Sequence, residues 1–312
     1  MNNKKDLPLP CVSVIIPVFN KKPYVERCLR SVLTQDLEAF EVIAVDDGSS
    51  DGSGSILDAM AEEFPNLRVI HVPNGGVTMA RRIGFEASKA EYITFVDADD
   101  QMKPNGLKTL YEAILREKAD EVVASFDTAA GRHVSGGFLG QADPDEMLWQ
   151  LCASKAKFCI LWAVIFRKQI LEGCLRDART RIRPGQDILM QMLCLVKRPK
   201  VVFIPDSVYI YSEGISRYGP PNLEAYKAFD EMLREAFMPR WNQLGDFFTM
   251  HQLKAYEIFI LWGKFDALSK YYKDTRLHIN RSHPLADRII ILLPPRLAYL
   301  LVKLRTLISR FS

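Results

Sequence analysis

Hydrophobic positions in the first 125 residues follow two alternating patterns. Residues 12–18 form a nearly unbroken β-branched run, which predicts a strand buried on both faces. After Pro23 the apolar residues fall at helical spacing, which predicts a helix. The pair of patterns then repeats, with strands at 40–45, 67–72, 92–96 and 121–125 and helices at 53–64, 77–89 and 104–118. This alternation predicts an α/β fold whose mostly parallel sheet carries helices on both faces.

After residue 126 the pattern becomes less regular. Glycine-rich residues 131–140 predict a mobile loop or a hairpin. Helices are expected at 147–154, 187–196, 220–237 and 247–272, and strands at 201–204 and 208–211. We therefore divide the chain into an α/β domain, residues 1–217, and a helical C-terminal region, residues 218–312.

Composition narrows the class of protein. Of the 312 residues, 48% are hydrophobic and 25% charged, which is typical of a globular protein, and a net charge of +3 is too small to indicate a nucleic-acid partner. The six cysteines include no C-x-x-C pair and predict buried, reduced thiols. Residues 1–10 lack the apolar core of a signal peptide, and no run reaches the ~18 apolar residues that span a bilayer. These features predict a cytoplasmic protein.

Polar residues follow the predicted strands where each one ends, at Asn20, at 46–52 and at 97–100. Open parallel sheets bind ligands at this edge. Clustered carboxylates repel one another and need a cation or a hydrogen-bonding ligand nearby. Helix capping explains Ser50 and Asp51 as well as ligand binding does. Capping does not explain the three acids at 97–100, because one cap needs one carboxylate.

The Asp97-Ala98-Asp99 sequence suits a hard divalent ion that bridges two phosphates. Mg²⁺ and Mn²⁺ prefer oxygen ligands and commonly take one or two carboxylates together with substrate phosphates. We expect Asp99 to hold the metal and Asp97 to reach the ribose or the sugar. The residues alone therefore predict a pocket for a nucleotide and a metal.

Three segments appear in a characteristic order: VSVIIPVFN from Val12, VDDGSSDGS from Val45, and NGGVTMARRIGFEASKAEYITFVDADD from Asn74. Together they resemble the family 2 glycosyltransferases of the GT-A fold, a Rossmann-like α/β fold, over roughly residues 11–217. The resemblance implies an enzyme that transfers a sugar from a nucleotide-sugar donor. UDP is favoured as the nucleotide through the resemblance alone.

The resemblance also implies roles for individual residues. The implied nucleotide-sugar-binding residues are Pro17, Phe19, Asn20, Asp46, Asp47, Arg81 and Asp97. The first three would line the base and ribose, and Asp46 would accept the imide hydrogen of a uracil with Asp47 beside it. Arg81 would contact the nucleotide; the alternative is a solvated helical arginine beside Arg82.

Gly185-Gln186-Asp187 matches the place where the family keeps Glu-Asp, which implies that Asp187 is the general base. The alternative is an aspartate that begins a helix and suits its dipole. Gln186 departs from the usual Glu, which puts acceptor contacts there in doubt. Relatives often carry a basic residue soon after the tyrosines corresponding to Tyr209 and Tyr211, whereas here only Arg217 follows, so the residue that supports the leaving diphosphate is unassigned.

The implied reaction is a single displacement with inversion at the anomeric carbon. Asp187 would take the proton of the acceptor hydroxyl, and Mg²⁺ or Mn²⁺ would neutralise charge on the leaving nucleoside diphosphate. The acceptor would be a glycan or glycolipid in cell-surface polysaccharide or lipopolysaccharide synthesis. The rival is an inactive relative that serves as a membrane-associated scaffold; the presence of Asp97, Asp99 and Asp187 argues against it.

The tail from Arg288 to Ser312 is basic and contains no acidic residue. Leu297, Leu300, Leu301, Leu304 and Ile308 recur at helical spacing, and Pro294-Pro295 interrupts the apolar run. A basic amphipathic helix predicts attachment to an anionic membrane surface, and so a peripheral protein on the cytoplasmic face of the inner membrane. The alternatives are packing on the protein itself or an oligomer contact.

Overall fold

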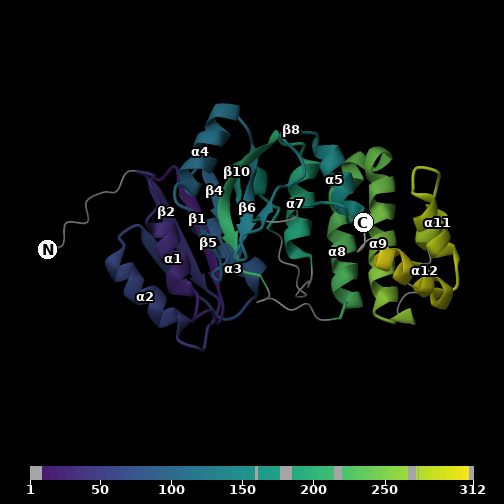
Figure 1. Cartoon of the computed structure of the whole chain (residues 1–312), viewed down its shortest axis with the longest axis horizontal. Helices are drawn as coiled ribbons and strands as arrows, with labels where there is room; N and C mark the ends of the chain where they lie inside the picture. Colours follow the sequence, from purple (N-terminus) through teal and green to yellow (C-terminus); the bar gives the residue numbers. More distant parts are fainter. Residues whose placement is uncertain are drawn as a thin grey trace. The chain divides into compact units, whose positions relative to one another are not determined.

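The computed structural model describes residues 9–158, 161–175, 185–213, 220–265, 272 and 274–308 (Figure 1). The chain divides into two compact units. The first is Met1–Pro144, Lys157–Asp177 and Lys197–Arg217; the second is Asp145–Ala156, Ala178–Val196 and Tyr218–Ser312. The long C-terminal segment of the second unit thus begins next to the boundary predicted at residue 217. The second unit also includes two earlier segments of the chain. The domain limits 1–217 and 218–312 stay a prediction.

The first unit is built on one sheet with the strand order β3-β2-β1-β4-β9-β6-β10-β5, with β7 paired to β6 and β8 to β10. The strands are β1 (Val12–Val18), β2 (Phe40–Asp46), β3 (Leu67–His71), β4 (Tyr92–Phe95), β5 (Gln101–Met102), β6 (Glu121–Thr128), β7 (His133–Val134), β8 (Gly140–Ala142), β9 (Val164–Arg167) and β10 (Val201–Tyr211). Strand β1 is parallel to β2 and β4, β2 to β3, and β6 to β10. The mostly parallel sheet predicted from the sequence is confirmed.

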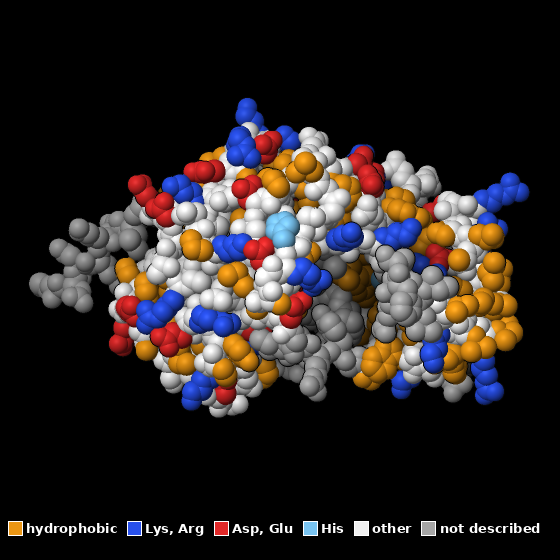
Figure 2. Space-filling view, in the orientation of Figure 1, with side chains coloured by type: hydrophobic (Ala, Val, Ile, Leu, Met, Phe, Trp, Pro, Cys, Tyr) orange, Lys and Arg blue, Asp and Glu red, His pale blue; other side chains and the backbone are white. Residues whose placement is uncertain are grey.

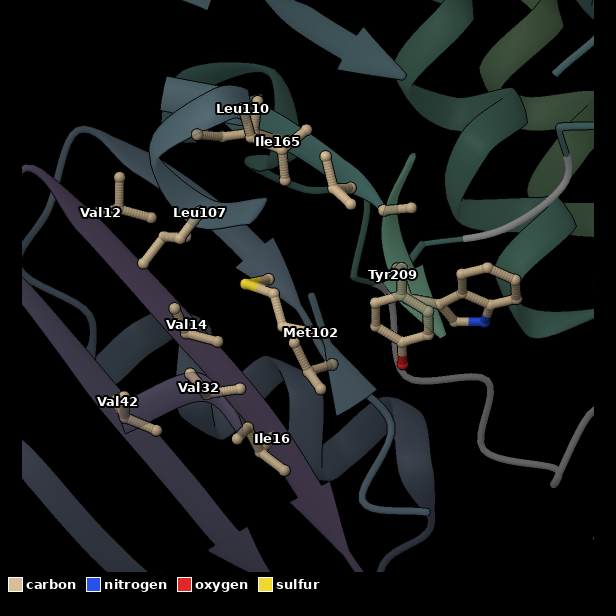
Figure 3. Packing of buried hydrophobic residues seen from close by; sticks show 14 of the residues in the cluster. Val12, Val14, Ile16, Val32, Val42, Met102, Leu107, Leu110, Ile165 and Tyr209 are labelled. Carbon is tan, nitrogen blue, oxygen red and sulfur yellow. The ribbon is translucent and has the colours of Figure 1, made fainter. Parts of the chain in front are cut away.

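Helices cover both faces of this sheet, as the alternating pattern predicts. Alternate β1 residues Val12, Val14 and Ile16 join one cluster with residues of α1 (Val25–Leu33), α2 (Ser53–Glu63) and α4 (Gly106–Glu117) (Figure 3). On the other face, α3 (Val77–Ala87) packs on β1 and β2. Since β1 is covered on both sides, both of its faces must be apolar, which explains its unbroken hydrophobic run.

Two features of the sheet differ from the sequence expectation, and a third agrees with it. Strand β9 was not predicted, and it lies antiparallel between β4 and β6. The two strands expected at 201–204 and 208–211 are one strand, β10, whose register with β6 shifts between Phe203 and Tyr209. Pro205 lies within this irregularity, and a proline cannot donate a ladder hydrogen bond. Residues 131–140 include β7, which forms a hairpin with β6, one of the two expected alternatives.

The second unit is helical, as expected. Its described helices are α5 (Pro144–Cys152), which begins at the unit boundary, α7 (Gln186–Val196), α8 (Leu223–Phe237), α9 (Trp241–Leu261), α11 (Leu285–Leu292) and α12 (Pro295–Ile308), with short 3₁₀ turns at Met238–Arg240 and Asp274–Leu277. A further short helix, α6 (Lys168–Leu171), belongs to the first unit. Within the described ranges, no helix combines the length and apolar character needed to cross a membrane.

The cysteines that the structure describes are free thiols, as predicted. Cys28, Cys152, Cys174 and Cys194 are buried, whereas Cys11 is only partly buried. Cys159 lies outside the described residues.

Candidate functional site

The polar strand ends meet at one edge of the sheet in the first unit. Strands β2, β1 and β4 are parallel neighbours, and the strand order reverses between β1 and β4. The loops after β1 and β2 are joined directly, since the Asn20 amide donates to Ser49 Oγ (3.0 Å) and the Ser50 amide donates to Asn20 Oδ1 (2.9 Å). Asn20 has φ +52°, a left-handed conformation that asparagine tolerates better than most residues. This edge is the switch point where open α/β sheets bind ligands.

Asp51 serves the local structure of this edge. Its Oδ1 accepts from the amide of Ser53 (2.9 Å) in the first turn of α2, and its Oδ2 accepts from the amide of Lys22 (2.9 Å). Asp51 thus contacts the first residue of α2, although the N-cap position itself is Gly52 and has no side-chain cap hydrogen bond; a ligand contact of Asp51 stays a prediction. The same carboxylate also ties the loop after β1 to the start of α2.

Asp46 is buried at the end of β2 and forms hydrogen bonds through both carboxylate oxygens. Oδ1 accepts from the Ser49 amide (3.0 Å), and Oδ2 lies 2.8 Å from His71 Nδ1. The other ring nitrogen of His71 lies 3.0 Å from Asp58 Oδ1. Burial acts to raise the pKa of Asp46, but the hydrogen bonds from Ser49 and His71 outweigh it and hold that pKa below its usual range. Asp46 is thus an ionised acceptor, and its contact with a base stays a prediction.

Asp47 organises the loop that leads into α3. Its carboxylate accepts from the amides of Gly75 (2.6 Å) and Gly76 (2.9 Å), and from the side-chain amide of Asn74 (3.2 Å). Only 3% of Asp47 is exposed. The acidic end of β2 therefore fixes the glycine-rich turn before α3, and the nucleotide-binding role predicted for Asp47 is untested.

Arg81, on α3, pairs with Asp97 at the end of β4. Its Nη2 donates to Asp97 Oδ1 at 2.9 Å, and its guanidinium lies 5.9 Å from the centre of the Phe95 ring. The Arg81 side chain is 4% exposed, so the alternative of a solvated helical arginine is wrong. The Asp97 side chain is 31% exposed, which makes it more accessible than Asp46, Asp47 or Asp99.

Asp99 forms an ion pair with Lys21, the residue that follows Asn20 after β1. The backbone carbonyl of Asp99 accepts from Arg27 Nη2 (3.2 Å) and from Ser212 Oγ (2.8 Å). These contacts hold the loop after β4 from both sides. Asp99 is placed next to Asp97 at the switch point, and a cationic group already lies on its carboxylate.

Asp100 is fully buried and shares Ser212 and Tyr209 with its neighbours, since Ser212 Oγ also donates to the Asp99 carbonyl and the Tyr209 hydroxyl accepts from the Asp97 amide (3.1 Å). Its Oδ2 accepts from the Tyr209 hydroxyl (2.9 Å) and its Oδ1 from the Ser212 amide (2.7 Å). Burial, helped by the negative charges of Asp97 and Asp99, raises the pKa of Asp100 to about 7. The Tyr209 ring, whose hydroxyl can be followed in Figure 3, stacks on Trp162 with ring centres 4.7 Å apart. Asp100 therefore anchors the loop on β10.

The remaining expected residues fall in two places. Pro17 pairs in register with Val45 inside the sheet, and Phe19 at the end of β1 exposes 44% of its surface, so an aromatic face is available beside Asn20. Asp187 belongs to the second unit, half-buried in the first turn of α7. This position suits a helix dipole as well as a catalytic role, and the assignment as general base stays a prediction. Arg217 lies outside the described residues.

The carboxylates at this edge are compatible with a divalent metal. Asp99 and Asp97 offer hard oxygen ligands two residues apart, the donor type and number that Mg²⁺ takes when phosphates complete its coordination. No group of three or more His, Cys, Asp or Glu side chains that could hold a metal occurs among the described residues. A cation at Asp99 would share this carboxylate with the ammonium of Lys21 or displace it.

Several residues of the site were missed by the sequence analysis. Lys21 has a local signal, since it directly follows the Asn20 that was selected. Tyr209 and Ser212 contact Asp100 from 109 and 112 residues away, and no local pattern reveals such a contact. His71 ends β3, the strand next to β2, and only the strand order brings it to Asp46.

Comparisons with known proteins agree with this architecture. Residues 13–175 match the family described as Glycosyl transferase family 2. EpsJ of Bacillus subtilis, described as an uncharacterized glycosyltransferase, is 29% identical over 244 residues, covering 74% of this chain and 69% of EpsJ. The poly(ribitol-phosphate) beta-glucosyltransferase of Bacillus spizizenii is 29% identical over 204 residues, covering 64% of this chain and 32% of that protein. GlyG of Streptococcus pneumoniae is 40% identical over 116 residues, 37% of this chain and 38% of GlyG.

A solved structure shares the fold. Staphylococcus aureus TarS 1-349 in complex with UDP-GlcNAc aligns with a TM-score of 0.61 and 19% identity, covering 86% of this chain and 89% of that one. The mostly parallel sheet and its acidic switch point thus define an α/β fold of the GT-A type, with a helical C-terminal region. Because the family match covers just over half of the chain, this protein belongs to glycosyl transferase family 2 and is a glycosyltransferase.

Proposed function

We propose that this glycosyltransferase moves a sugar from a UDP-sugar donor, with inversion, to a glycan or glycolipid acceptor in cell-surface glycan synthesis. The observation that carries the proposal is the switch-point edge, where the ends of β1, β2 and β4 bring Asn20, Asp46 and Asp97 together in a family 2 chain. The name of the B. spizizenii relative, a poly(ribitol-phosphate) beta-glucosyltransferase, supports the class of acceptor. The TarS complex with UDP-GlcNAc supports the donor.

The proposed donor site contains buried residues that hold its loops and accessible residues that can contact a ligand. Asp46 and Asp47 are at most 5% exposed and hold the loops in place, whereas Phe19 and Asp97 are accessible. An exposed aromatic ring can stack on a base, and an ionised carboxylate can accept hydrogen bonds from hydroxyl groups. In this proposal Phe19 covers the base, and Asp97, held by Arg81, binds the ribose or the sugar.

Asp99 would hold Mg²⁺ or Mn²⁺, with Asp97 beside it and the donor's phosphates completing the coordination. When bound, such an ion supplies Lewis-acid stabilisation of the charge on the departing diphosphate. The contacts of the Asp99 backbone carbonyl with Arg27 and Ser212 hold the backbone at this position, and the carboxylate itself pairs with Lys21.

Asp187 would act as the general base that removes the proton from the acceptor hydroxyl as its oxygen attacks the anomeric carbon. The Asp187 carboxylate lies in the first turn of α7, where a carboxylate suits the positive end of the helix dipole. We place this reaction at the cytoplasmic face of a membrane, where the protein would act as a peripheral enzyme. The rival function, an inactive scaffold, predicts no turnover with any donor.

A thermal-shift screen tests donor and metal together. A ligand that binds only the folded state raises the unfolding temperature by mass action. UDP and UDP-sugars with Mn²⁺ or Mg²⁺ are expected to raise it more than GDP or dTDP do. EDTA should reduce the shift. A larger rise of the unfolding temperature with GDP than with UDP would overturn the choice of UDP. A rise that EDTA leaves unchanged would overturn the proposal that a metal takes part in donor binding.

Replacement of Asp99 by Ala tests the metal site. The Asp99→Ala variant should fold but lose metal-dependent transfer, because it lacks the proposed ligand. Asp36→Ala is the matched control, since the Asp36 side chain is 75% exposed and pairs only with Lys108 among the described residues. Near-full activity in Asp99→Ala would show that Asp99 does not carry the metal.

Replacement of Asp187 by Asn tests the base. The Asp187→Asn variant keeps the size of the side chain but cannot take up a proton at neutral pH. Donor binding should persist while turnover falls by roughly 10²–10⁴-fold. Product stereochemistry followed by NMR tests inversion in the same assay. Unchanged turnover would leave Asp187 with only its helix-terminal role.

A further inference from the structure

The C-terminal helices α11 and α12 each have an inward face that packs within the second unit. On α12 this face contains Ala298 and Val302, which are 0% and 1% exposed, and on α11 it contains Ile290 and Ile291, which are 3% and 0% exposed. Both helices pack against α9 and against each other. The tail is therefore part of the folded second unit, and internal packing, one alternative for its basic sequence, accounts for this face.

A buried ion network fixes the same inward face. Arg305 of α12 donates from Nη1 to Asp287 Oδ1 (2.6 Å) and forms a second ion pair with Glu257 of α9. Lys254 donates to the same oxygen of Asp287 at 2.8 Å. Glu257 and Asp287 are 6% and 4% exposed. The acidic groups of this region are thus buried and neutralised, and Arg305 is a packing residue rather than a free surface cation.

The opposite side of the two helices is apolar and exposed. This leucine face consists of Leu285, Ile289 and Leu292 of α11 and Leu297, Leu300, Leu301 and Leu304 of α12, and each of these residues exposes between 42% and 65% of its surface. Figure 2 shows hydrophobic side chains gathered over α11 and α12, at the right of the view. Packing within the second unit leaves this set of side chains uncovered, and a contiguous apolar surface of this kind marks an interaction site.

The exposed charged residues of α11 and α12 are basic. Arg296 and Lys303 of α12 are exposed, and residues 288–308 contain no Asp or Glu. The acidic residue nearest in sequence is Asp287, which is buried. Two copies related by a two-fold axis through this face would bring Arg296 and Lys303 of each copy towards like charges, which opposes association. An apolar surface with a cationic border is instead complementary to an anionic lipid layer.

We propose that the leucine face binds an anionic lipid bilayer, with its Leu and Ile side chains entering the boundary between headgroups and acyl chains and Arg296 and Lys303 contacting anionic headgroups. Neither α11 nor α12 spans the bilayer; both lie in its surface. The surface is defined without the donor site, and the consequence that the enzyme works where glycolipid acceptors are embedded rests on the proposed function.

Vesicle sedimentation of the full chain tests this surface. Vesicles of phosphatidylglycerol and phosphatidylcholine should bind the protein, pure phosphatidylcholine vesicles should bind it more weakly, and high salt should reduce the difference. Changing Leu297, Leu300 and Leu304 together to Ser should lower the partition coefficient at least about tenfold, because binding scales with the apolar area inserted. The matched control is Leu115→Ser with Leu139→Ser, two exposed leucines of the first unit.

Charge variants test the second half of the proposal. Arg296→Gln and Lys303→Gln should each lower binding to anionic vesicles about fivefold and leave binding to neutral vesicles unchanged. Arg116→Gln, on an exposed arginine of the first unit, should change neither. Circular dichroism of every variant checks that the helices remain folded. UDP binding, measured on the same samples, distinguishes a failure of this surface from a failure of the proposed function.

Several outcomes would overturn the lipid assignment. Equal binding to anionic and neutral vesicles would show that Arg296 and Lys303 do not contact anionic headgroups. An unchanged partition coefficient in the folded triple serine variant would show that the leucine face does not bind the vesicles. A wild-type dimer that ignores vesicles and becomes monomeric in the triple serine variant would assign the face to a second copy of the chain.

Discussion

At the residue scale, the acids of the strand ends differ in what their carboxylates already bind. Asp47 caps backbone amides and Asp100 anchors on Tyr209, while Asp97 and Asp99 pair with Arg81 and Lys21. The sequence predicts that these acids gather, because parallel strands end at one edge. It does not predict the partners, because Arg81, Tyr209 and Lys21 reach the acids from three different elements. Of these acids, Asp97 has the more exposed side chain, at 31%, whereas the Asp99 side chain is 12% exposed.

His71 should make stability depend on pH. The hydrogen bonds of His71 with Asp58 and Asp46 raise its pKa above the usual value near 6.5. Protonated His71 therefore favours the folded state below pH ~6.5, and this contribution is lost as pH rises through the raised pKa. We expect His71→Gln to cost stability at pH 5.5 and to cost less at pH 8.5, as measured by urea unfolding.

His278→Gln is the control for this experiment, because His278 is exposed and no carboxylate contact is found for it among the described residues. Its effect should be small at both pH values. The His71 side chain is 47% exposed, so solvent weakens the effect, and the sign rather than the size is the test. A loss of stability in His71→Gln that grows with pH would contradict the pairing.

At the scale of elements, the sequence predicts best where one periodicity covers a whole segment. Strand β1 was predicted with its observed limits, Val12–Val18, since both of its faces are buried and no other pattern overlaps it. Strand β9 was missed because residues 159–166 form one apolar run that a helix or a strand could equally occupy. What decides β9 is its pairing with β4 and β6, which are distant in the sequence.

Gly84 should be required for the packing of α3 on β1. A Cβ atom at Gly84 would lie 2.5 Å from Ile15 Cγ2, a side chain that is itself fully buried. Overpacking of this kind costs about 1–3 kcal/mol, which exceeds the gain of up to ~1 kcal/mol from the better helix propensity of alanine. We expect Gly84→Ala to lower the free energy of unfolding in urea titrations.

Gly245→Ala is the matched control in α9. Its nearest neighbour would be Trp241 at 3.4 Å, an ordinary van der Waals distance. Without a clash, the helix propensity term should remain and raise the free energy of unfolding by up to ~1 kcal/mol. If Gly84→Ala and Gly245→Ala change the free energy of unfolding in the same direction, the close approach of α3 to β1 is not the reason that position 84 requires glycine.

At the scale of the whole molecule, the sequence predicts an α/β region and a helical region. It does not predict which segments of the chain belong to each of them. The segments Asp145–Ala156 and Ala178–Val196 belong to the helical unit although both precede residue 217. The helices predicted within them, 147–154 and 187–196, could belong to either unit, so only tertiary contacts can assign them. The tail shows the same limit, since the sequence offers membrane binding and internal packing as alternatives. The structure shows internal packing for one face, and membrane binding is proposed for the other.

The last prediction concerns Arg305, which links α12 to the rest of the second unit. Burial raises the pKa of Glu257, and Lys254 and Arg305 counteract this effect. Arg305→Met keeps the aliphatic stem but leaves Glu257 and Asp287 with Lys254 alone. The free energy of unfolding should fall at pH 8 by less than the ~3–5 kcal/mol of a fully buried pair, because the Arg305 side chain is 39% exposed. The loss should be smaller at pH 5, where Glu257 can take up a proton on folding.

Arg296→Met separates this effect from a general role of basic residues in the tail. Arg296 is exposed, so its replacement should change stability by less than ~0.5 kcal/mol while weakening binding to anionic vesicles. UDP affinity should be unchanged in both variants, because every predicted donor-binding residue lies in the first unit. Equal stability losses in the two variants would mean that the buried ion network does not hold α12. A loss of UDP binding in Arg305→Met would mean that the donor site depends on the second unit.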